Sequence, residues 1–274
     1  MVGFDNGTFR GLEQIGIPIT SISINRGYGA FEFFEVINHR PFYGERHLAR
    51  FRHSLDCLKL KTPFDDRLSE LVGELIERTP LPNFYVKMFA LPHQSFHDGH
   101  YDAFLYLFPT QMPVYNDLLY QHGAKLLLKE YERFMPEAKS TNYLAGQYWN
   151  DEIDNPQVVD VLYYHNGIIR ETSRGNIFMV REGKVCTPGQ LILKGITRSV
   201  VIDILADQGI PFEETDIPVD QLLHADEVFL SSTTKLILPV TQIEDHVIGN
   251  GEPGEMTRRI MTAFHKIKEA FRKA

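Results

Sequence analysis

The chain has 274 residues, enough for one large domain or two modest ones, and its 43% hydrophobic and 23% charged content is ordinary for a globular protein. A formal net charge of −8 argues against a broad nucleic-acid surface, which needs a basic stripe, but it allows a local positive pocket for a small anion. Two cysteines are too few for a disulfide framework, and neither a signal peptide nor a membrane-length apolar run is evident, so we expect a cytoplasmic protein without a membrane partner.

Apolar periodicity predicts two helices in the first half of the chain. Apolar residues recur at helical spacing over 47–60 and again over 65–78. Short apolar and aromatic runs over 84–91 and 103–108 predict strands. Residues 109–123 contain two prolines and few periodic apolar residues, and we expect them to form a linker.

The second half of the chain also mixes strands and helices. Strand-like runs separated by polar turns occupy residues 124–129, 158–164 and 176–180. One helix is expected to start near Thr197, and another closes the chain, with apolar residues on one face over 260–271. This mixture predicts an α/β or α+β protein of two domains, which we place at 1–115 and 116–274.

Lys139 opens the segment Lys-Ser-Thr-Asn-Tyr-Leu, residues 139–144. Most lysines are solvated surface residues, and position alone does not separate that case from a functional one. A desolvated lysine more readily loses its proton, and its free amine can attack a carbonyl group.

Glu171 follows a turn at Asn166-Gly167 and begins the segment Glu-Thr-Ser-Arg-Gly-Asn-Ile-Phe, residues 171–178. It is either an exposed carboxylate at a strand end or the partner of a pyridine nitrogen. In the second case the carboxylate keeps the ring protonated, and a protonated ring takes up electrons from a neighbouring carbanion.

Three segments are candidates for binding a phosphate. The glycine of Gly195-Ile196-Thr197 lies just before the predicted helix, whose first N–H groups and dipole attract anions, although Thr197 could instead be an ordinary N-cap. Ser231–Thr234 offers hydroxyl groups after a strand-like run, or forms a plain loop. Arg50 lies at the boundary of the first predicted helix, where its guanidinium can bind phosphate or form an ordinary salt bridge.

The segment 93–102 contains three histidines and two aspartates, namely His93, His97, Asp98, His100 and Asp102. Histidines at helical spacing and a cysteine partner are missing, and Asp98-Gly99 interrupts the segment, so a solvated loop is favoured over a zinc site and no metal is expected. A third hypothesis assigns His93 or His97 to a substrate carboxylate across a dimer interface.

Taken in order, these segments resemble the class IV aminotransferases, the fold-type-IV pyridoxal phosphate enzymes. That family includes branched-chain aminotransferases, D-amino acid aminotransferases and aminodeoxychorismate lyases. The resemblance runs from about Ile24 to Gly254. The matching segments are Gly27-Tyr-Gly-Ala-Phe-Glu32, Glu45-Arg-His-Leu-Ala-Arg50, residues 139–144, residues 171–178, Thr187-Pro188, Gly195-Ile-Thr-Arg198, Ala225-Asp-Glu-Val-Phe229 and Ser231-Ser-Thr-Thr234.

The resemblance implies a small N-terminal α/β domain on the substrate side, a larger barrel-like C-terminal domain that binds pyridoxal phosphate, and a homodimer. It implies that Lys139 forms a Schiff base with the cofactor and moves a proton, and that Glu171 meets the pyridine nitrogen. The remaining cofactor contacts that it implies are Arg50, the amides of Ile196 and Thr197, and Thr233 for the phosphate, with Tyr143 near the phenolic oxygen.

The chain departs from the family in the first domain, where substrates are chosen. Tyr28 replaces the usual aspartate, Lys87 stands where many members have arginine, and Phe33 stands where the lyases tend to have threonine. The predicted substrate contacts are Phe31, Lys87, His93 and His97. We therefore favour transamination of an amino acid and keto acid pair, and the alternative is the aminodeoxychorismate lyase of folate biosynthesis.

Overall fold

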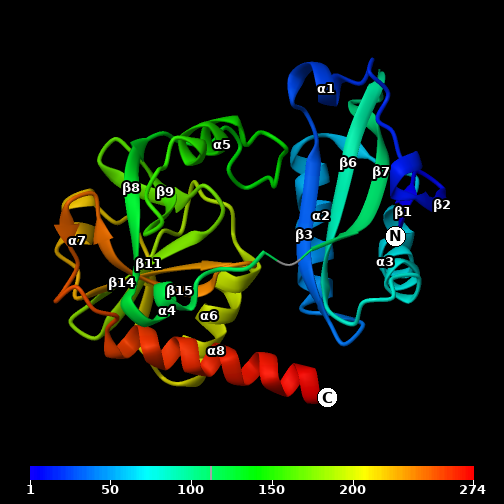
Figure 1. Ribbon diagram of the computed structural model, residues 1–274. Coiled ribbons are helices and arrows are strands. Elements are labelled where there is room, and N and C mark those ends of the chain that lie inside the picture. The colour runs from blue at the N-terminus through cyan, green and yellow to red at the C-terminus, as the bar shows by residue number, and fades with distance from the viewer. Residues whose placement is uncertain (112) are drawn as a thin grey trace. The chain divides into compact units, whose positions relative to one another are not determined.

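The computed structural model describes residues 1–111 and 113–274, with the side chains of Gln94 and Ser95 outside the described set. The chain forms two compact units (Figure 1). Unit 1 comprises Met1–Met112 and Glu137–Asn142, and unit 2 comprises Pro113–Pro136 and Tyr143–Ala274. The first crossing lies three residues before the boundary predicted after residue 115. The six-residue segment around Lys139, which the sequence placed in the second domain, belongs to unit 1.

Unit 1 is built on a seven-stranded sheet in the order β2-β1-β7-β6-β3-β4, with β5 paired to β7. Its strands are β1 (Val2–Asp5), β2 (Thr8–Gly11), β3 (Ala30–Ile37), β4 (Arg40–Pro41), β5 (Leu60–Lys61), β6 (Phe84–His97) and β7 (His100–Thr110). Its helices are α1 (Ile22–Arg26), α2 (Gly44–Cys57) and α3 (Leu68–Glu77). Both predicted long helices are therefore present, and each buries the apolar stripe that predicted it.

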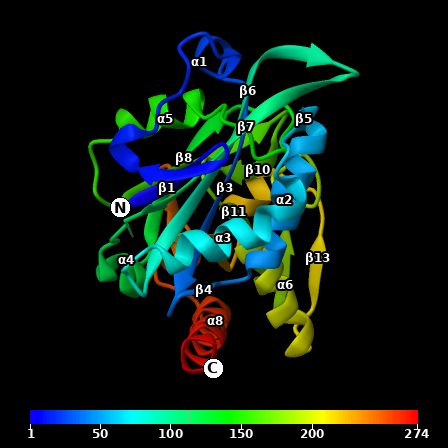
Figure 2. The ribbon, with the colours of Figure 1, turned by 90° about the vertical axis from the view of Figure 1, so that its right-hand side faces the viewer.

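The β6–β7 hairpin differs from the expected solvated loop (Figure 2). Both strands continue past their predicted ends, and His97 pairs with His100 across the turn. Asp98 and Gly99 have φ values of 49° and 81°, and two successive positive φ values are what a tight two-residue hairpin turn requires. Asp-Gly is thus the turn of a hairpin here, and the prediction that it interrupts the segment was wrong.

Unit 2 is built on a nine-stranded sheet that forms the half-barrel expected of the larger domain, in the order β10-β9-β8-β15-β14-β11-β12-β13, with β16 paired to β15. Its strands are β8 (Ala124–Glu130), β9 (Val158–His165), β10 (Ile168–Thr172), β11 (Asn176–Arg181), β12 (Lys184–Thr187), β13 (Phe212–Glu214), β14 (Glu227–Ser232), β15 (Leu236–Ile243) and β16 (His246–Val247). The predicted mixed α/β class is confirmed.

The helices of unit 2 are α4 (Asp117–His122), α5 (Leu144–Asp151), α6 (Ile196–Asp207), α7 (Val219–Leu223) and α8 (Glu255–Lys273). α8 packs on α6 and on strands β14 and β15. Part of the expected linker is regular structure, because β7 continues to Thr110 and α4 occupies Asp117–His122; Met112, also in that range, lies outside the described residues. Asn116 caps α4 by accepting a hydrogen bond from the backbone of Leu118. An asparagine before a helix is an N-cap pattern, but the linker was predicted from the two prolines and this pattern was not considered.

No helix in the described part of the chain has the length and apolar character needed to cross a lipid bilayer.

Candidate active site

Lys139 lies on a short segment that extends the sheet of unit 1 beside β3. The Lys139 carbonyl accepts a hydrogen bond from the Phe31 amide at 2.9 Å, and the Lys139 amide donates to Ser54 Oγ at 3.0 Å. Ser140 forms a bridge with Ala30. These contacts explain why the segment belongs to unit 1. The Lys139 side chain is half-buried, and Nζ lies 4.3 Å from the centroid of the Phe31 ring.

Arg50 is held by a buried carboxylate on the other face of β3. Arg50 Nε and Nη2 donate to the two oxygens of Glu32 at 3.0 and 2.7 Å, and His47 Nδ1 lies 3.0 Å from Glu32 Oε1. Burial alone would raise the pKa of Glu32, but Arg50 and His47 outweigh it and hold that pKa well below its usual value. Sequence patterns assigned no role to Glu32 and His47, although His47 stands in the segment that identified Arg50 and Glu32 ends the matching segment 27–32.

Glu171 is buried in unit 2 and has donors near both carboxylate oxygens. The Leu193 amide donates to Oε2 at 3.1 Å, and Arg133 Nη1 lies 3.4 Å from Oε1. Arg133 also lies over the ring of Tyr143, 5.5 Å from its centroid. Burial would lower the pKa of Arg133, but Tyr143 and Glu171 outweigh it and raise that pKa. Arg133 had no signal in the sequence, because no motif includes it.

The loop before α6 is fixed by Asn176. Its side-chain amide donates to the Leu193 carbonyl at 2.8 Å, and its oxygen accepts from the Gly195 amide at 3.2 Å. α6 begins at Ile196 with Gly195 as its N-cap, so Thr197 is not the cap that the alternative hypothesis made it. The amides of Ile196 and Thr197 lie in the first turn, where N–H groups have no acceptor within the helix and the dipole favours an anion.

Ser231 places a hydroxyl group next to Asn176, since the two residues pair across β14 and β11. Ser231 Oγ is buried and, within the described part of the chain, has no hydrogen-bond partner. A buried polar atom without a partner is costly, and a ligand that bonds to it removes that cost. Thr233, the predicted phosphate contact, follows β14 and is half-buried.

The residues present fit pyridoxal phosphate. In unit 2, the Leu193 amide binds the Glu171 carboxylate three residues before α6 begins at Ile196. A carboxylate has about four acceptor positions, so Glu171 can meet a pyridine N–H in addition to its two donors. Arg50 and Lys139 belong to unit 1.

Two of the predicted substrate residues, Phe31 and Lys87, lie on one face of β3 and β6 in unit 1. Lys87 Nζ lies 5.1 Å from the centroid of the Phe89 ring and 5.9 Å from that of Phe31. Phe33 pairs with Lys87 on the same face. Phe34 points to the opposite face, is fully buried and packs against His47.

The two predicted substrate histidines have different surroundings. The His93 ring stacks on Phe104, with 5.4 Å between ring centroids. His97 lies at the turn of the hairpin near Asp102.

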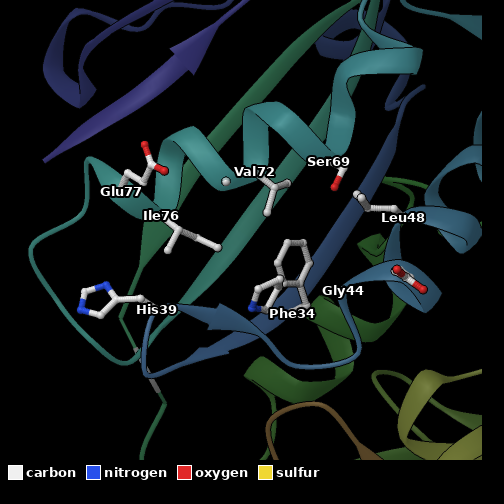
Figure 3. Close-up of a pocket in the computed structure, with 11 residues that line it drawn as sticks. Phe34, His39, Gly44, Leu48, Ser69, Val72, Ile76 and Glu77 are labelled. Carbon is white, nitrogen blue, oxygen red and sulfur yellow. The ribbon is translucent and has the colours of Figure 1, made fainter. Parts of the chain in front are cut away.

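A cavity of about 600 Å³ lies among β3, α2 and α3 (Figure 3). Apolar side chains such as Phe34, Leu48 and Val72 line it together with His39 and Glu77. None of the residues predicted to bind cofactor or substrate lines this cavity.

Comparison with known proteins identifies the family. Residues 29–243 match the sequence profile described as amino-transferase class IV. The chain is 26% identical to a D-alanine aminotransferase of Bacillus licheniformis over 268 residues, 94% of each chain, and 27% identical to one of Listeria monocytogenes over 263 residues, 92% of this chain and 91% of the relative.

Solved structures give the same result. A branched-chain amino acid aminotransferase of T.th. with pyridoxamine 5′-phosphate has a TM-score of 0.88 at 25% identity, covering 97% of this chain and 93% of that one. The branched-chain aminotransferase of Thermoproteus uzoniensis with norvaline has a TM-score of 0.87 at 27% identity, covering 97% and 94%. The chain therefore belongs to the class IV aminotransferase family of enzymes, as its ordered motifs predicted.

Proposed function

We propose that this protein uses pyridoxal phosphate to transfer an amino group between an amino acid and a keto acid. The observation that carries the proposal is the buried Glu171 carboxylate, which is held by Arg133 and by the amide of Leu193, three residues before the start of α6. Pyridoxal phosphate has a basic ring nitrogen at one end and a phosphate at the other. A fixed carboxylate suits the ring nitrogen, and the neighbouring helix N-terminus suits the phosphate.

Pyridoxal phosphate supplies a protonated ring that stabilises negative charge at the α-carbon of the amino acid. In the proposed site Glu171 holds the proton on the ring nitrogen. Lys139 would hold the cofactor through Nζ, and once the substrate amino group has displaced Nζ from the cofactor, the freed amine would remove and return the α-proton of the substrate. The proposed phosphate contacts are Arg50, Ile196, Thr197 and Thr233, and Tyr143 is assigned to the phenolic oxygen.

Visible absorption of the protein saturated with pyridoxal phosphate tests this proposal. We expect a visible band that borohydride abolishes, with the reduced cofactor recovered on the peptide that contains Lys139. Lys139→Ala should lose the band, whereas the matched variant Lys129→Ala, which changes a lysine on β8, should keep it. A protein that stays colourless after reconstitution, or that carries the label on another lysine, contradicts the proposal.

Substrate choice is proposed to depend on Phe31, Lys87, His93 and His97. The relatives are named for D-alanine and for branched-chain amino acids, so an informative panel includes D- and L-forms of both. We expect amino-group transfer to a keto acid from at least one of them. Release of pyruvate from aminodeoxychorismate without amino transfer would instead favour the lyase. A homodimer and a cytoplasmic location stay predictions from the sequence.

A further inference from the structure

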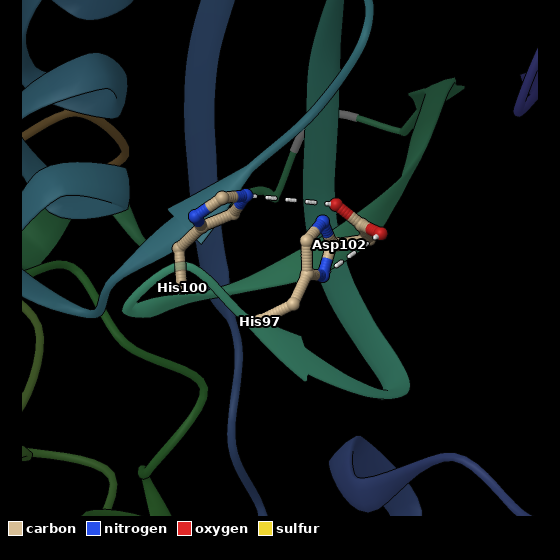
Figure 4. A group of neighbouring side chains, drawn as sticks. All are labelled: His97, His100 and Asp102. Atoms are coloured by element: carbon tan, nitrogen blue, oxygen red, sulfur yellow. Dashed lines mark ion pairs between the residues drawn. The ribbon is translucent and has the colours of Figure 1, made fainter.

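The tip of the β6–β7 hairpin gathers three side chains that can bind a metal ion (Figure 4). His97 ends β6, and His100 begins β7 directly opposite. Asp102 lies two residues beyond His100 and so projects from the same face of the strand. One donor atom from each residue lies within 4.8 Å of the other two. The hairpin brings two histidines together across its turn, as helical spacing brings histidines together in other metal sites.

Each imidazole lies near a different oxygen of the Asp102 carboxylate. His97 Nδ1 lies 3.7 Å from Asp102 Oδ2, and His100 Nε2 lies 3.8 Å from Asp102 Oδ1. Ligand atoms at tetrahedral zinc lie about 3.3 Å apart, given bonds of about 2 Å. The side chains of His97 and Asp102 are 52% and 54% exposed, so small rotations that close the gap meet little resistance, whereas His100 at 13% is already held in place.

The backbone also sets which nitrogen of His100 is available. His100 Nδ1 lies 3.3 Å from the carbonyl oxygen of Asp98. A carbonyl oxygen can only accept, so this hydrogen bond places the proton on Nδ1 and leaves the lone pair on Nε2, the atom that faces Asp102. Histidines that bind metals commonly donate their other ring N–H to a carbonyl or a carboxylate in this way.

We propose that this hairpin binds one divalent transition-metal ion of the zinc class through His97 Nδ1, His100 Nε2 and the Asp102 carboxylate. Two imidazole nitrogens and one carboxylate oxygen suit zinc, cobalt or nickel, whereas magnesium and calcium prefer oxygen ligands alone. Three protein ligands leave a coordination position open to water. In the proposed function, His97 is a substrate contact, and His97, His100 and Asp102 are not contacts of the cofactor. The metal site therefore does not depend on that function.

Titration with zinc chloride tests the site on protein without an affinity tag, saturated with cofactor and free of substrate. Calorimetry and equilibrium dialysis are expected to give one zinc ion per chain for the wild type. His97→Gln and Asp102→Asn should each weaken binding at least tenfold. The matched variant His246→Ala removes an exposed histidine from β16 in unit 2 and should bind zinc as the wild type does.

Two further measurements keep a failure to fold apart from a failure to bind. His97→Gln changes an exposed side chain of similar size, so its circular dichroism and Tm should match the wild type. Cobalt should give visible d–d bands in the wild type that His97→Gln and His100→Gln weaken. Absence of zinc binding by the wild type, or equal binding by the wild type and a His97→Gln/Asp102→Asn double variant, overturns the proposal.

Discussion

At the scale of single residues, Glu171 has two different donors. The Leu193 amide fixes one oxygen through the backbone, and Arg133 places a buried positive charge near the other. The backbone contact sets the position of the carboxylate, and the guanidinium supplies a positive charge opposite it. Both features suit a group that must stay negative while buried beside a positively charged ring.

We expect Glu171→Gln to lower kcat about 100-fold, because an amide keeps the shape of the side chain but does not stabilise a protonated ring as the reaction develops charge. KM should change much less than kcat. Steady-state kinetics with the best substrate of the panel measure both. Glu132→Gln is the control, since Glu132 pairs with Arg170 at 2.7 Å and stands one residue before Arg133. If the Glu171→Gln variant has the wild-type kcat, Glu171 does not stabilise the protonated ring during the reaction.

At the scale of elements, the start of α6 depends on a glycine for reasons of space. Gly195 has φ −65°, a value open to every residue, so backbone strain plays no part. A Cβ atom there would lie 2.3 Å from Asn176 Oδ1, the atom that accepts the Gly195 amide. Any side chain at this position must therefore displace Asn176, which also holds the Leu193 carbonyl.

Gly195→Ala is expected to weaken binding of pyridoxal phosphate at least tenfold and to cost about 1–3 kcal/mol of stability, the usual range for overpacking. Cofactor titration followed by absorbance measures the first effect, and urea unfolding the second. Gly73→Ala on α3 is the matched control, because a Cβ there meets no atom within 4 Å and alanine favours a helix. Equal cofactor affinity in both variants would show that Asn176 tolerates the displacement.

At the scale of the whole molecule, each unit contains a buried ion pair. Unit 1 has Glu32 with Arg50, and unit 2 has Asp160 with Lys235, whose Nζ lies 2.9 Å from Asp160 Oδ2. Burial alone would raise the pKa of Asp160, but Lys235, Arg174 and Ser173 outweigh it and lower that pKa. A carboxyl group whose folded pKa is lowered contributes stability above its unfolded pKa of about 4, and this stability is lost as the pH falls through the folded value.

Lys235→Met is expected to destabilise unit 2 by about 3–5 kcal/mol at pH 7, because it leaves the Asp160 charge buried without its main partner. The loss should shrink as the pH falls towards 4. Without Lys235, burial of Asp160 is less opposed, so the pKa of this carboxyl group is higher in the variant than in the wild type and the group takes up a proton more readily. Urea unfolding followed by Trp149 fluorescence reports on unit 2, because Trp149 is the single tryptophan of the chain and lies on α5.

Adding Asp160→Asn to Lys235→Met should restore part of the stability, because the double variant no longer buries an unpaired charge. If Lys235→Met alone unfolds at the wild-type urea concentration, the pair does not stabilise unit 2.

Much of the site could be predicted because its residues stand in short local motifs. Lys139, Glu171 and the start of α6 were singled out as candidates in this way. Arg133 was not, because its partner Glu171 is distant in sequence and only the folded chain brings the two together. Local patterns also predicted the positions of α2, α3, α6 and α8 to within a few residues. The hairpin at Asp98-Gly99 was missed because Asp-Gly was taken as an interruption of the segment and not as the turn between two strands.

Unit 1 contains two separate stretches of chain, and the second stretch, Glu137–Asn142, is flanked on both sides by unit 2. The polypeptide therefore passes between the units three times. A single backbone cut after residue 112 would not release a complete unit 1, since the piece with Lys139 would remain covalently part of the larger fragment. The first 112 residues produced alone would lack their partner for the backbone of Gly29 and Phe31. The two units are thus compact bodies but not interchangeable modules, and a gene fusion or split that treats residue 115 as a clean border would divide unit 1 itself.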